Sequence, residues 1–491
     1  MMANNRRNFL KLSGLAGLMG MTGTSMLKSC MQPGDNDASK SKSSHPGLPG
    51  EGKQLFNMCG YAAPKLDTVR VGLIGLGNRG ILHLGHMLRI KEAQVAAICD
   101  IRPEKINAAQ ASAEKMGQQP ATYSGGEYEW KKLCEREDVD LIFICTPWAL
   151  HTPMAVYAME QGKHVCVEVP ASVTVEQSWQ LVETSERTRK YCMMLENVCY
   201  GFFELLTLNM ARKGVFGDII HGEAAYIHDL LIANFDKEEY YNMWRLRENA
   251  ERNGNLYPTH GLGPICQIMN INRGDKMDFL VSVSSNDFMM GAKAKELAAK
   301  DAFYKPFVDK PFRGNINTSV IKTSRGRTIM LQHDVTSPRP YSRIDLISGT
   351  KGAAMQYPKP AIYLADEHPA ADWRKQPPHD WVSPERYKEL EKKHSPEIVK
   401  KLGDLAARIG GHGGKDFLMN WRTIDCLRNG LPLDQDVYDA ALWSAVGSLT
   451  EQSVSQGSNP VAVPDFTRGS WNKNKSVDIS ISGGGTTGVV V

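Results

Sequence analysis

The sequence lacks the marks of several protein classes. It has no CxxC pair and no His/Cys spacing suited to zinc, and its ten cysteines are scattered singly, which argues against a zinc site or a disulfide framework. Beyond the N-terminal segment no stretch approaches about 18 consecutive apolar residues, so no transmembrane helix is expected there. No basic tract stands out in a chain whose net charge is only +4, which argues against nucleic acid as a partner.

What is present is the composition of a globular protein that is too long for one compact domain. The 491 residues, 42% hydrophobic and 23% charged, suit two domains with extensions. Composition and pattern predict, in order, a signal over 1–30, a flexible tether over 31–66, an N-terminal domain over 67–196, a second domain over 197–480 and a frayed glycine-rich tail over 481–491.

The first thirty residues are typical of an export signal. Arg6 and Arg7 precede Phe-Leu-Lys and a mildly apolar stretch over 12–27, which resembles a twin-arginine signal; an ordinary secretory signal with two adjacent arginines is the alternative. The segment 27–30 resembles a lipobox, in which Cys30 would become the lipidated N-terminus, although a lysine is unusual inside it. We therefore expect a periplasmic protein, or a membrane-anchored lipoprotein if Cys30 is modified.

A dinucleotide-binding fingerprint opens the N-terminal domain. The apolar run 69–74 leads into Gly-Leu-Gly-Asn-Arg-Gly over 75–80, and a helical pattern follows. Gly75 permits the tight turn, Gly77 lets the backbone approach a pyrophosphate, and Gly80 lets the helix pack close to the strand. The N-terminus of that helix supplies oriented N–H donors to phosphates.

The next strand, 94–99, ends at Asp100, where an acid meets the ribose hydroxyls of a bound dinucleotide. A carboxylate there repels a 2′-phosphate, so NAD is favoured over NADP. Arg102 lies close by in the sequence and keeps NADP as the alternative.

Strands and helices continue to alternate up to residue 167, which predicts a parallel sheet. Trp148 and His151 follow the strand 139–145, and Glu168 follows the strand 164–167. Ligands bind outside the carboxyl ends of such strands, so these side chains are predicted near the nicotinamide half of the cofactor. Loop packing of Trp148 and a capping or core role of His151 are the alternatives.

After Asn197 the alternation weakens. The predicted fold is therefore an α/β Rossmann domain followed by an α+β domain with a mostly antiparallel sheet. A segment rich in Pro, Lys and Glu over 358–401 is predicted to be an insertion or lid, and 434–456 a helix. The predicted strands of the second domain are 217–230, 277–287, 315–335 and 342–348.

Two pairs of aromatic and imidazole side chains stand out in the second domain. Tyr226 and His228 are two apart on a predicted strand, so both face the same side. Tyr257 and His260 sit in a predicted proline-containing loop. Tyrosines stack on sugar faces and donate hydrogen bonds, and histidine exchanges protons near neutral pH. We expect the four to converge on a hydroxylated ring, with plain packing as the alternative.

Taken together, several motifs resemble glycoside hydrolase family 109, the NAD-dependent α-N-acetylgalactosaminidases within the glucose–fructose oxidoreductase and inositol dehydrogenase superfamily. Ordinary dehydrogenases of that superfamily carry Glu-Lys-Pro where this sequence has Glu168-Val169-Pro170, and a valine cannot do the acid–base work of their lysine. The motifs span most of the chain: the twin-arginine start, 75–80, 148–151, 168–170, 196–200, 225–229, 255–261 and 339–341.

The resemblance implies a role for each matching residue. The residues implied to contact NAD are Asn78, Arg79, Asp100, Trp148, His151, Glu168, Val169 and Asn197. The residues implied to line a sugar pocket are Tyr226, Arg245, Tyr257 and Tyr341, with His228 and His260 near the reacting carbons. A glycan or glycoconjugate would be the partner, no metal is expected, and an exposed sheet face in the second domain would favour a homodimer.

The implied chemistry is redox-neutral cleavage of terminal α-linked N-acetylgalactosamine. NAD⁺ removes hydride from C3, the ketone acidifies the C2 hydrogen, the C1 substituent leaves by elimination, water adds, and the hydride returns to C3. His260 and His228 are expected to transfer protons, assisted by Tyr226 or Tyr257. No pair of carboxylates stands out for the two-acid route of most glycosidases. The alternatives are a sugar dehydrogenase that releases oxidised product and a non-catalytic glycan-binding lipoprotein.

Overall fold

The computed structural model describes residues 52–367, 380–476 and 478–490. The expected export signal, Cys30 and the first part of the expected tether lie outside the described residues, as does the segment 368–379 of the expected lid. No helix in the described part of the chain is both long enough and apolar enough to cross a lipid bilayer.

A parallel sheet of six strands forms the N-terminal domain, in the order β3-β2-β1-β4-β5-β6. Every residue of β4 and β5 is buried, as expected for strands that are covered on both faces. The strand order reverses between β1 and β4, which is where such sheets bind ligands. The strands are β1 (Val69–Ile74), β2 (Ala93–Cys99), β3 (Ala121–Tyr123), β4 (Leu141–Ile144), β5 (His164–Val167) and β6 (Cys192–Met194). The helices between them are α2 (Asn78–Met87), α3 (Pro103–Glu114), α4 (Glu129–Cys134), α5 (Trp148–Glu160) and α6 (Val175–Thr188).

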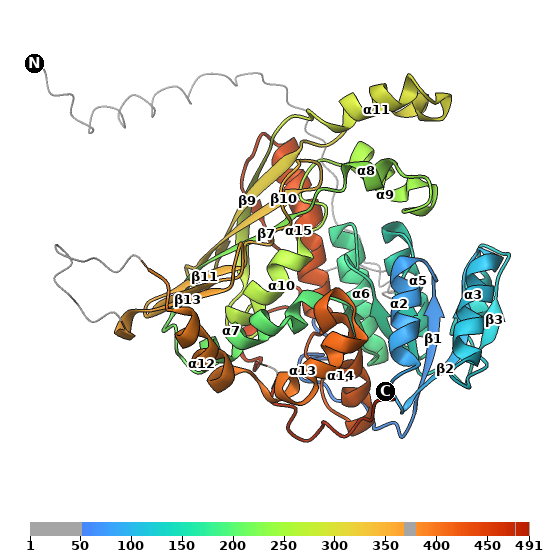
Figure 1. The fold of residues 1–491 in the computed structure, drawn as a ribbon, viewed down its shortest axis with the longest axis horizontal. Helices are drawn as coiled ribbons and strands as arrows, with labels where there is room; N and C mark the ends of the chain where they lie inside the picture. Colours follow the sequence, from blue (N-terminus) through green and yellow to red (C-terminus); the bar gives the residue numbers. More distant parts are fainter. Residues whose placement is uncertain (1–51, 368–379, 477, 491) are drawn as a thin grey trace, which may run out of the picture. The chain divides into compact units, whose positions relative to one another are not determined.

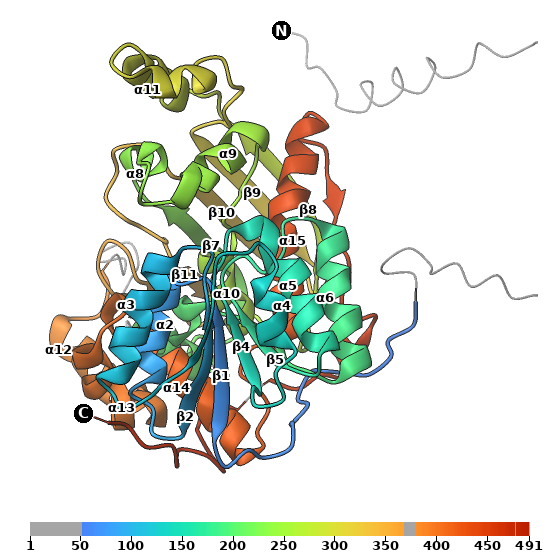
Figure 2. The ribbon, with the colours of Figure 1, turned by 90° about the vertical axis from the view of Figure 1, so that its right-hand side faces the viewer.

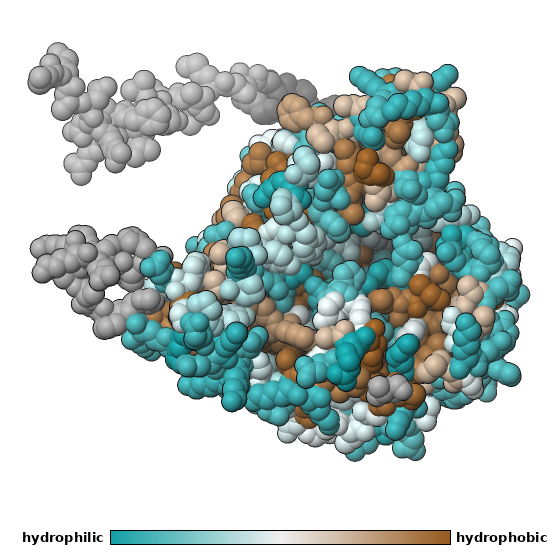
Figure 3. Space-filling model, in the orientation of Figure 1, coloured by the Kyte–Doolittle hydropathy of each residue, from teal (hydrophilic) through white to brown (hydrophobic). Residues whose placement is uncertain are grey.

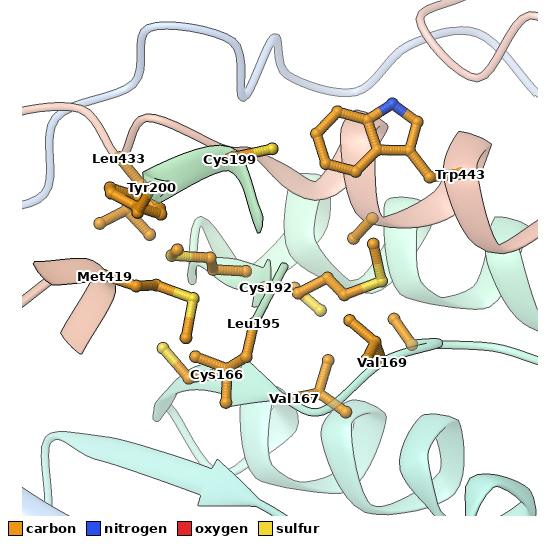
Figure 4. Packing of buried hydrophobic residues seen from close by; sticks show 14 of the residues in the cluster. Cys166, Val167, Val169, Cys192, Leu195, Cys199, Tyr200, Met419, Leu433 and Trp443 are labelled. Carbon is orange, nitrogen blue, oxygen red and sulfur yellow. The ribbon is translucent and has the colours of Figure 1, made fainter. Parts of the chain in front are cut away.

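Two helices from the end of the chain complete the core of this domain. Helix α14 (Lys415–Asn429) packs on α2 and on the short 3₁₀ helix η1 (Asn197–Tyr200), and α15 (Val437–Ser455), the helix predicted over 434–456, packs on α6 and β6. Figure 4 shows Met419 of α14 and Trp443 of α15 together with Cys166 of β5. The hydrophobic core therefore continues across the predicted domain boundary at residue 196.

A sheet of eight strands forms the second domain, in the order β13-β12-β11-β7-β10-β9-β8-β14. Its neighbouring strands are antiparallel except for β7 with β10, which are parallel. The predicted strand 315–335 is two strands, because a turn with Gly326 at φ +85° reverses the chain. The strands are β7 (Ile219–Ile227), β8 (Met277–Ser284), β9 (Ile316–Thr323), β10 (Thr328–Asp334), β11 (Leu346–Gly349), β12 (Gly352–Met355), β13 (Ala361–Leu364) and β14 (Val461–Ala462).

Helices cover one face of this second sheet. Helix α10 packs on β7 and α15 packs on β8, and Figures 1 and 2 show α10 between the two sheets. Figure 1 shows no helix of the described chain over the opposite face. The other helices of this domain are α7 (Phe202–Arg212), α8 (Leu231–Phe235), α9 (Trp244–Glu251), α10 (Thr259–Ile268), α11 (Met290–Ala298), α12 (Pro384–His394) and α13 (Glu397–Ile409).

The described part of the expected tether is packed rather than flexible. Met58 and Ala63 are each 3% exposed, and the backbone N–H of Ala63 donates to the Tyr191 hydroxyl at 2.7 Å. The structure thus corrects the predicted end of the tether at residue 66. Composition misled here because apolar side chains scattered among polar ones are enough to anchor a short segment.

The expected frayed tail is also wrong. The buried Asp425 carboxylate accepts hydrogen bonds from the backbone N–H groups of Gly485 and Thr486 at 2.8 and 3.1 Å, and Val489 pairs with Ile90 in an isolated β-bridge. The glycines let the backbone approach the carboxylate closely. The described part of the expected lid is a surface excursion in which α12 packs on α7, and α13 packs on α7 and α14.

Candidate active site

Two of the three glycines in the phosphate-binding loop are required by the packing of the fold, and the third is not. Gly75 has φ +86°, and a Cβ on it would lie 2.7 Å from the carbonyl oxygen of Cys145. A Cβ on Gly80 would lie 1.8 Å from the carbonyl oxygen of Gly75. A Cβ on Gly77 would meet nothing closer than the Arg102 guanidinium at 4.0 Å. The space in front of Gly77 is therefore open to a ligand, as the second glycine of a dinucleotide site requires.

The start of α2 has the character of an anion site. No side chain caps this helix and its first turn holds no acidic residue, so its first N–H groups are free to meet phosphate oxygens. Asp100 lies beside it: one carboxylate oxygen accepts from the backbone N–H of Leu76 at 2.7 Å, and the other accepts from that of Arg102 at 2.9 Å. These bonds fix the Asp100 carboxylate at the edge where ribose hydroxyls would bind.

A buried ionic network joins α2, the end of β5 and α14. Arg79 donates to Glu168 at 2.6 Å and to Asp416 at 3.0 Å, and the His83 ring lies 2.8 Å from Glu168. Burial acts to raise the pKa of Glu168, but Arg79 and His83 hold it well below its usual range. Arg79 and Glu168, both predicted to contact NAD, thus form an ion pair with each other in this structure.

Asn197 has a buried acceptor oxygen that fits a hydrogen-bond donor of a cofactor. Its side-chain N–H donates to Asp416 at 2.6 Å, which fixes the orientation of the amide, while its carbonyl oxygen is buried without a partner. A buried acceptor left unpaired is costly, and an amide or hydroxyl of a bound dinucleotide would satisfy it. Together with the open space at Gly77 and the free N–H groups of α2, this oxygen shows that the residues fit NAD.

The loop after β4 is held in place by the buried side chain of His151. The His151 ring nitrogens lie 2.7 Å from the carbonyl oxygens of Pro170 and Thr146, and burial lowers the pKa of His151 although both carbonyls act the other way. A neutral ring has one N–H and donates to one of these two carbonyls, so His151 serves to hold the loop in place. Val169, next to Glu168, is 4% exposed.

An aromatic wall meets this loop from the second domain. Trp148 stacks on Tyr257 with ring centroids 5.7 Å apart, and Tyr257 lies 4.7 Å from Tyr226. Tyr341 stands edge-on to His228 at 5.0 Å. The side chains predicted to line the sugar pocket are thus brought together, directly beside the residue predicted to meet the nicotinamide.

Arg245 is a buried cation without a carboxylate partner in the described chain. It is 7% exposed and donates to the Tyr240 hydroxyl at 3.1 Å. Its guanidinium lies over the rings of Trp148, Tyr240 and Tyr257 at 5.3, 5.2 and 4.9 Å. One of its terminal nitrogens has no hydrogen-bond partner. Such a group is suited to an acceptor oxygen of a ligand.

His260 is held by a carboxylate in a defined orientation. Its Nδ1 lies 2.7 and 2.9 Å from the two oxygens of Glu196, which is 0% exposed. Burial lowers the pKa of His260 although Glu196 acts to raise it, so the ring is neutral near pH 7. The neutral ring donates its Nδ1–H to Glu196, which leaves Nε2 bare and able to accept a proton.

A second proton-carrying pair lies opposite. The Tyr226 hydroxyl is 2.9 Å from Nδ1 of His228, which confirms that the two face the same side. Burial raises the pKa of Tyr226, although Arg245 acts to lower it, and burial lowers the pKa of His228. Tyr226 therefore stays protonated and donates to the neutral imidazole. In the described residues no group of three or more His, Cys, Asp or Glu side chains is arranged to hold a metal ion.

Comparisons with known proteins agree with this geometry. The family profile "Glycosyl hydrolase 109, C-terminal domain" matches residues 200–473, and "Oxidoreductase family, NAD-binding Rossmann fold" matches 69–196. A Shewanella pealeana protein named "Glycosyl hydrolase family 109 protein" is 45% identical over 97% of this chain and 99% of its own. The chain belongs to glycoside hydrolase family 109. It is an NAD-dependent glycoside hydrolase, as the sequence predicts.

One relative carries the name of an activity. A Bacteroides fragilis protein named "Alpha-N-acetylgalactosaminidase" is 47% identical over 85% of this chain and 96% of its own. Among solved structures, levoglucosan dehydrogenase in complex with NADH has a TM-score of 0.58 at 17% identity, covering 81% of this chain and all of that one. A scyllo-inositol dehydrogenase from Lactobacillus casei has a TM-score of 0.56 at 14% identity, with 81% and 100% covered. The dehydrogenases share the fold with this family 109 enzyme.

The structure adds two residues to the predicted site and places His260 in a different element from the one predicted. His260 lies in the first turn of α10, after Pro258 at its N-cap, and not in a loop as expected. Glu196 and Asp416 received no role from sequence reasoning. Glu196 is the second residue after the strand at 192–194, so the rule that ligands meet the carboxyl ends of strands could have marked it. Asp416 carried no such signal.

The pairing of His260 with Glu196 makes a prediction about pH. As pH falls through the pKa of His260, the bare Nε2 is lost, so kcat/KM falls on an acid limb below the ordinary histidine value of about 6.5. In Glu196→Gln the amide donates to Nδ1 and forces the proton onto Nε2, so we expect kcat to fall by about 100-fold or more. The carboxylate that raises the His260 pKa is also gone, so the acid limb moves to lower pH.

Steady-state kinetics from pH 4 to 9 on Glu196→Gln measure both effects. Glu186→Gln is the control, because Glu186 is equally buried at 1% exposure but pairs with Tyr438 and Arg468 instead. It should leave the position of the acid limb unchanged. A Glu196→Gln enzyme with the wild-type kcat and acid limb would remove His260 from the role of base.

Proposed function

We propose that this enzyme hydrolyses terminal α-linked N-acetylgalactosamine from glycans or glycoconjugates. The observation that supports it best is that a neutral base, His260, and a buried cation without a carboxylate partner in the described chain, Arg245, meet the cradle that fits NAD. The tyrosine wall offers stacking faces and hydroxyl donors to a pyranose ring. The unpaired nitrogen of Arg245 suits an acceptor such as an acetamido carbonyl or a ring hydroxyl. The name carried by the Bacteroides fragilis relative agrees with this substrate.

When bound, NAD⁺ supplies a hydride acceptor for C3 of the sugar that later gives the hydride back. His260 takes a proton through Nε2, and Glu196 stabilises the imidazolium that results. The Tyr226 hydroxyl passes a proton to His228 or receives one from it, while Arg245 favours the charged form of Tyr226 when it arises. The aromatic wall keeps water from the reacting carbons until the C1 substituent has left.

The main alternative, a sugar dehydrogenase, fits the site less well. Superfamily dehydrogenases use a lysine where this chain has Val169, which is buried and holds no exchangeable proton. The acid–base groups of this site come instead from the end of β7 and the residue after it, from the segment after β6 and from α10, all grouped on the side of the aromatic wall. The arrangement suits proton transfers at more than one carbon of a retained sugar.

Isotope exchange separates the two reactions. An aryl α-N-acetylgalactosaminide with deuterium at C2 should release product that has lost its deuterium to water, because the elimination removes that hydrogen, and NADH should not accumulate. Mass spectrometry of the product and nicotinamide absorbance measure the two results. Complete retention of deuterium, or NADH rising with turnover, would contradict the proposal. A panel of aryl glycosides that differ in ring and anomer checks the substrate.

We also propose that the protein is exported by the twin-arginine route and works in the periplasm, anchored through Cys30. The support is the sequence at 6–11 and at 27–30. Arg6→Lys with Arg7→Lys should retain the protein in the cytoplasm, whereas Cys30→Ala should be exported but lose its membrane association. Cell fractionation measures both outcomes. Export that is unaffected by the two lysines would point to the ordinary secretory route.

The uncovered face of the second sheet supports a homodimer. Val283 and Val320 are 56% and 49% exposed, and Val320 lies between Val281 and Met330 on neighbouring strands. Val281 and Met330 are half-buried, and exposed or half-buried apolar side chains that adjoin on an uncovered sheet face mark an association surface. We expect Val320→Lys to convert a dimer into a monomer in sedimentation experiments. A wild-type protein that is monomeric at micromolar concentration would refute the dimer.

A further inference from the structure

One segment of the second domain reaches across the mouth of the cofactor cradle. Residues 236–243, between α8 and α9, form what we call the strap. On one side the Asn78 amide, at the start of α2, donates to the carboxylate and the carbonyl oxygen of Glu239 at 3.1 and 3.3 Å. On the other side the Arg102 guanidinium lies over the Tyr241 ring at 4.6 Å. The strap thus touches both flanks of the loop whose second glycine leaves space for phosphate.

The ends of the strap are fastened to the second domain. Lys237 pairs with Asp301 at 2.9 Å, and the Tyr240 hydroxyl accepts from Arg245 at 3.1 Å. Just after the strap, Trp244 stands edge-on to Trp148 at 5.1 Å. Contacts of this one segment therefore run from the flank of Asp100 to the side predicted for the nicotinamide. Figure 3 shows the surface hollowed between the lobe of α8 and α9 and the helix α2.

The contacts that the strap makes with the first domain are of a kind that can break without unfolding the protein. Glu239 and Tyr241 are exposed, so separating them from Asn78 and Arg102 uncovers little apolar surface. Met243, at the end of the strap, is buried and has φ 49°, next to Asn242 at φ 55°. Packing of the buried Met243 holds that residue in a sparsely populated backbone region, which places the bend at the fixed end of the strap.

We infer that the strap closes over bound NAD and slows its exchange, with Glu239 and Tyr241 as the positioning residues. The inference rests on the proposed function, because a cofactor that regains its hydride in every cycle has no need to leave. An enzyme exported with its cofactor would also find no replacement outside the cytoplasm. The strap joins the two domains through its contacts with Asn78 and Arg102, on either side of the space in front of Gly77, so moving it away from this space requires both contacts to break.

Exchange of the bound cofactor tests the strap directly. Purified holoenzyme is mixed with excess isotopically labelled NAD, and the replacement of the bound molecule is followed by mass spectrometry after denaturation. We expect exchange to be roughly fivefold faster in Tyr241→Ala and about tenfold or more faster in Tyr241→Ala with Glu239→Ala. Association of NAD with cofactor-free enzyme should also be faster, because a clasp obstructs both directions, whereas a simple binding contact would change dissociation alone.

Tyr128→Ala is the matched control. Tyr128 is a 61% exposed tyrosine that has its own cation contact, with Lys131 at 5.2 Å, away from the strap, and its loss should leave exchange unchanged. A second measurement does not depend on variants: strap amides should exchange hydrogen more slowly with NAD bound than without. Unchanged exchange in the double variant, or strap amides insensitive to NAD, would overturn the inference. The assay needs no sugar, so accelerated exchange in an enzyme that fails to cleave the glycoside would leave the strap standing and the proposed substrate refuted.

Discussion

The buried ion pairs of Arg79 hold together parts of the site that lie far apart in the chain. Arg79 stands at the phosphate loop, Glu168 at the end of β5 and Asp416 on α14. Glu168 and Asp416 are buried although the Arg79 side chain is 29% exposed, so losing Arg79 would leave two buried carboxylates without their guanidinium partner, which is destabilising. Asn197 is oriented by the same Asp416. The cradle therefore keeps its shape only while all three charges are present, and the C-terminal helices are part of the cofactor site.

This chain has Val169 where the dehydrogenases of the superfamily carry a lysine, so its acid–base groups must lie elsewhere in the site. The cofactor side of the pocket then offers a buried aliphatic group, a His151 whose pKa is lowered by burial between two backbone carbonyls, and carboxylates that are already paired, none of which can accept a proton readily. The second domain fills this gap, because Glu196 and His260 form a base whose tautomer is fixed. Glu196 ends the Rossmann half of the chain while His260 opens α10, so the base is assembled across the two domains.

Local sequence rules predict the parts of the site that local sequence builds. The glycine loop, Asp100 after its strand and the shared face of Tyr226 and His228 each depend on spacing within a few residues, and spacing is visible in a sequence. Asp416 joins Arg79 from 337 positions away, and the tail folds back onto Asp425, so neither leaves a local trace. His260 could be predicted only in part. Pro258 indicates an interruption of regular structure in the sequence, but only the packing of α10 against β7 shows that a helix begins there.

The same interactions explain why the site favours a closed cycle over release of oxidised sugar. A guanidinium that has no carboxylate partner, as Arg245 has none in the described chain, is costly to bury, and the Tyr240 hydroxyl and the aromatic rings around it compensate only in part. A sugar oxygen that completes its hydrogen bonds recovers this cost for as long as the ring stays bound, which holds an oxidised intermediate in place. Val169 carries no exchangeable proton, so in the proposed cycle the bases of the second domain would act again on the retained ring.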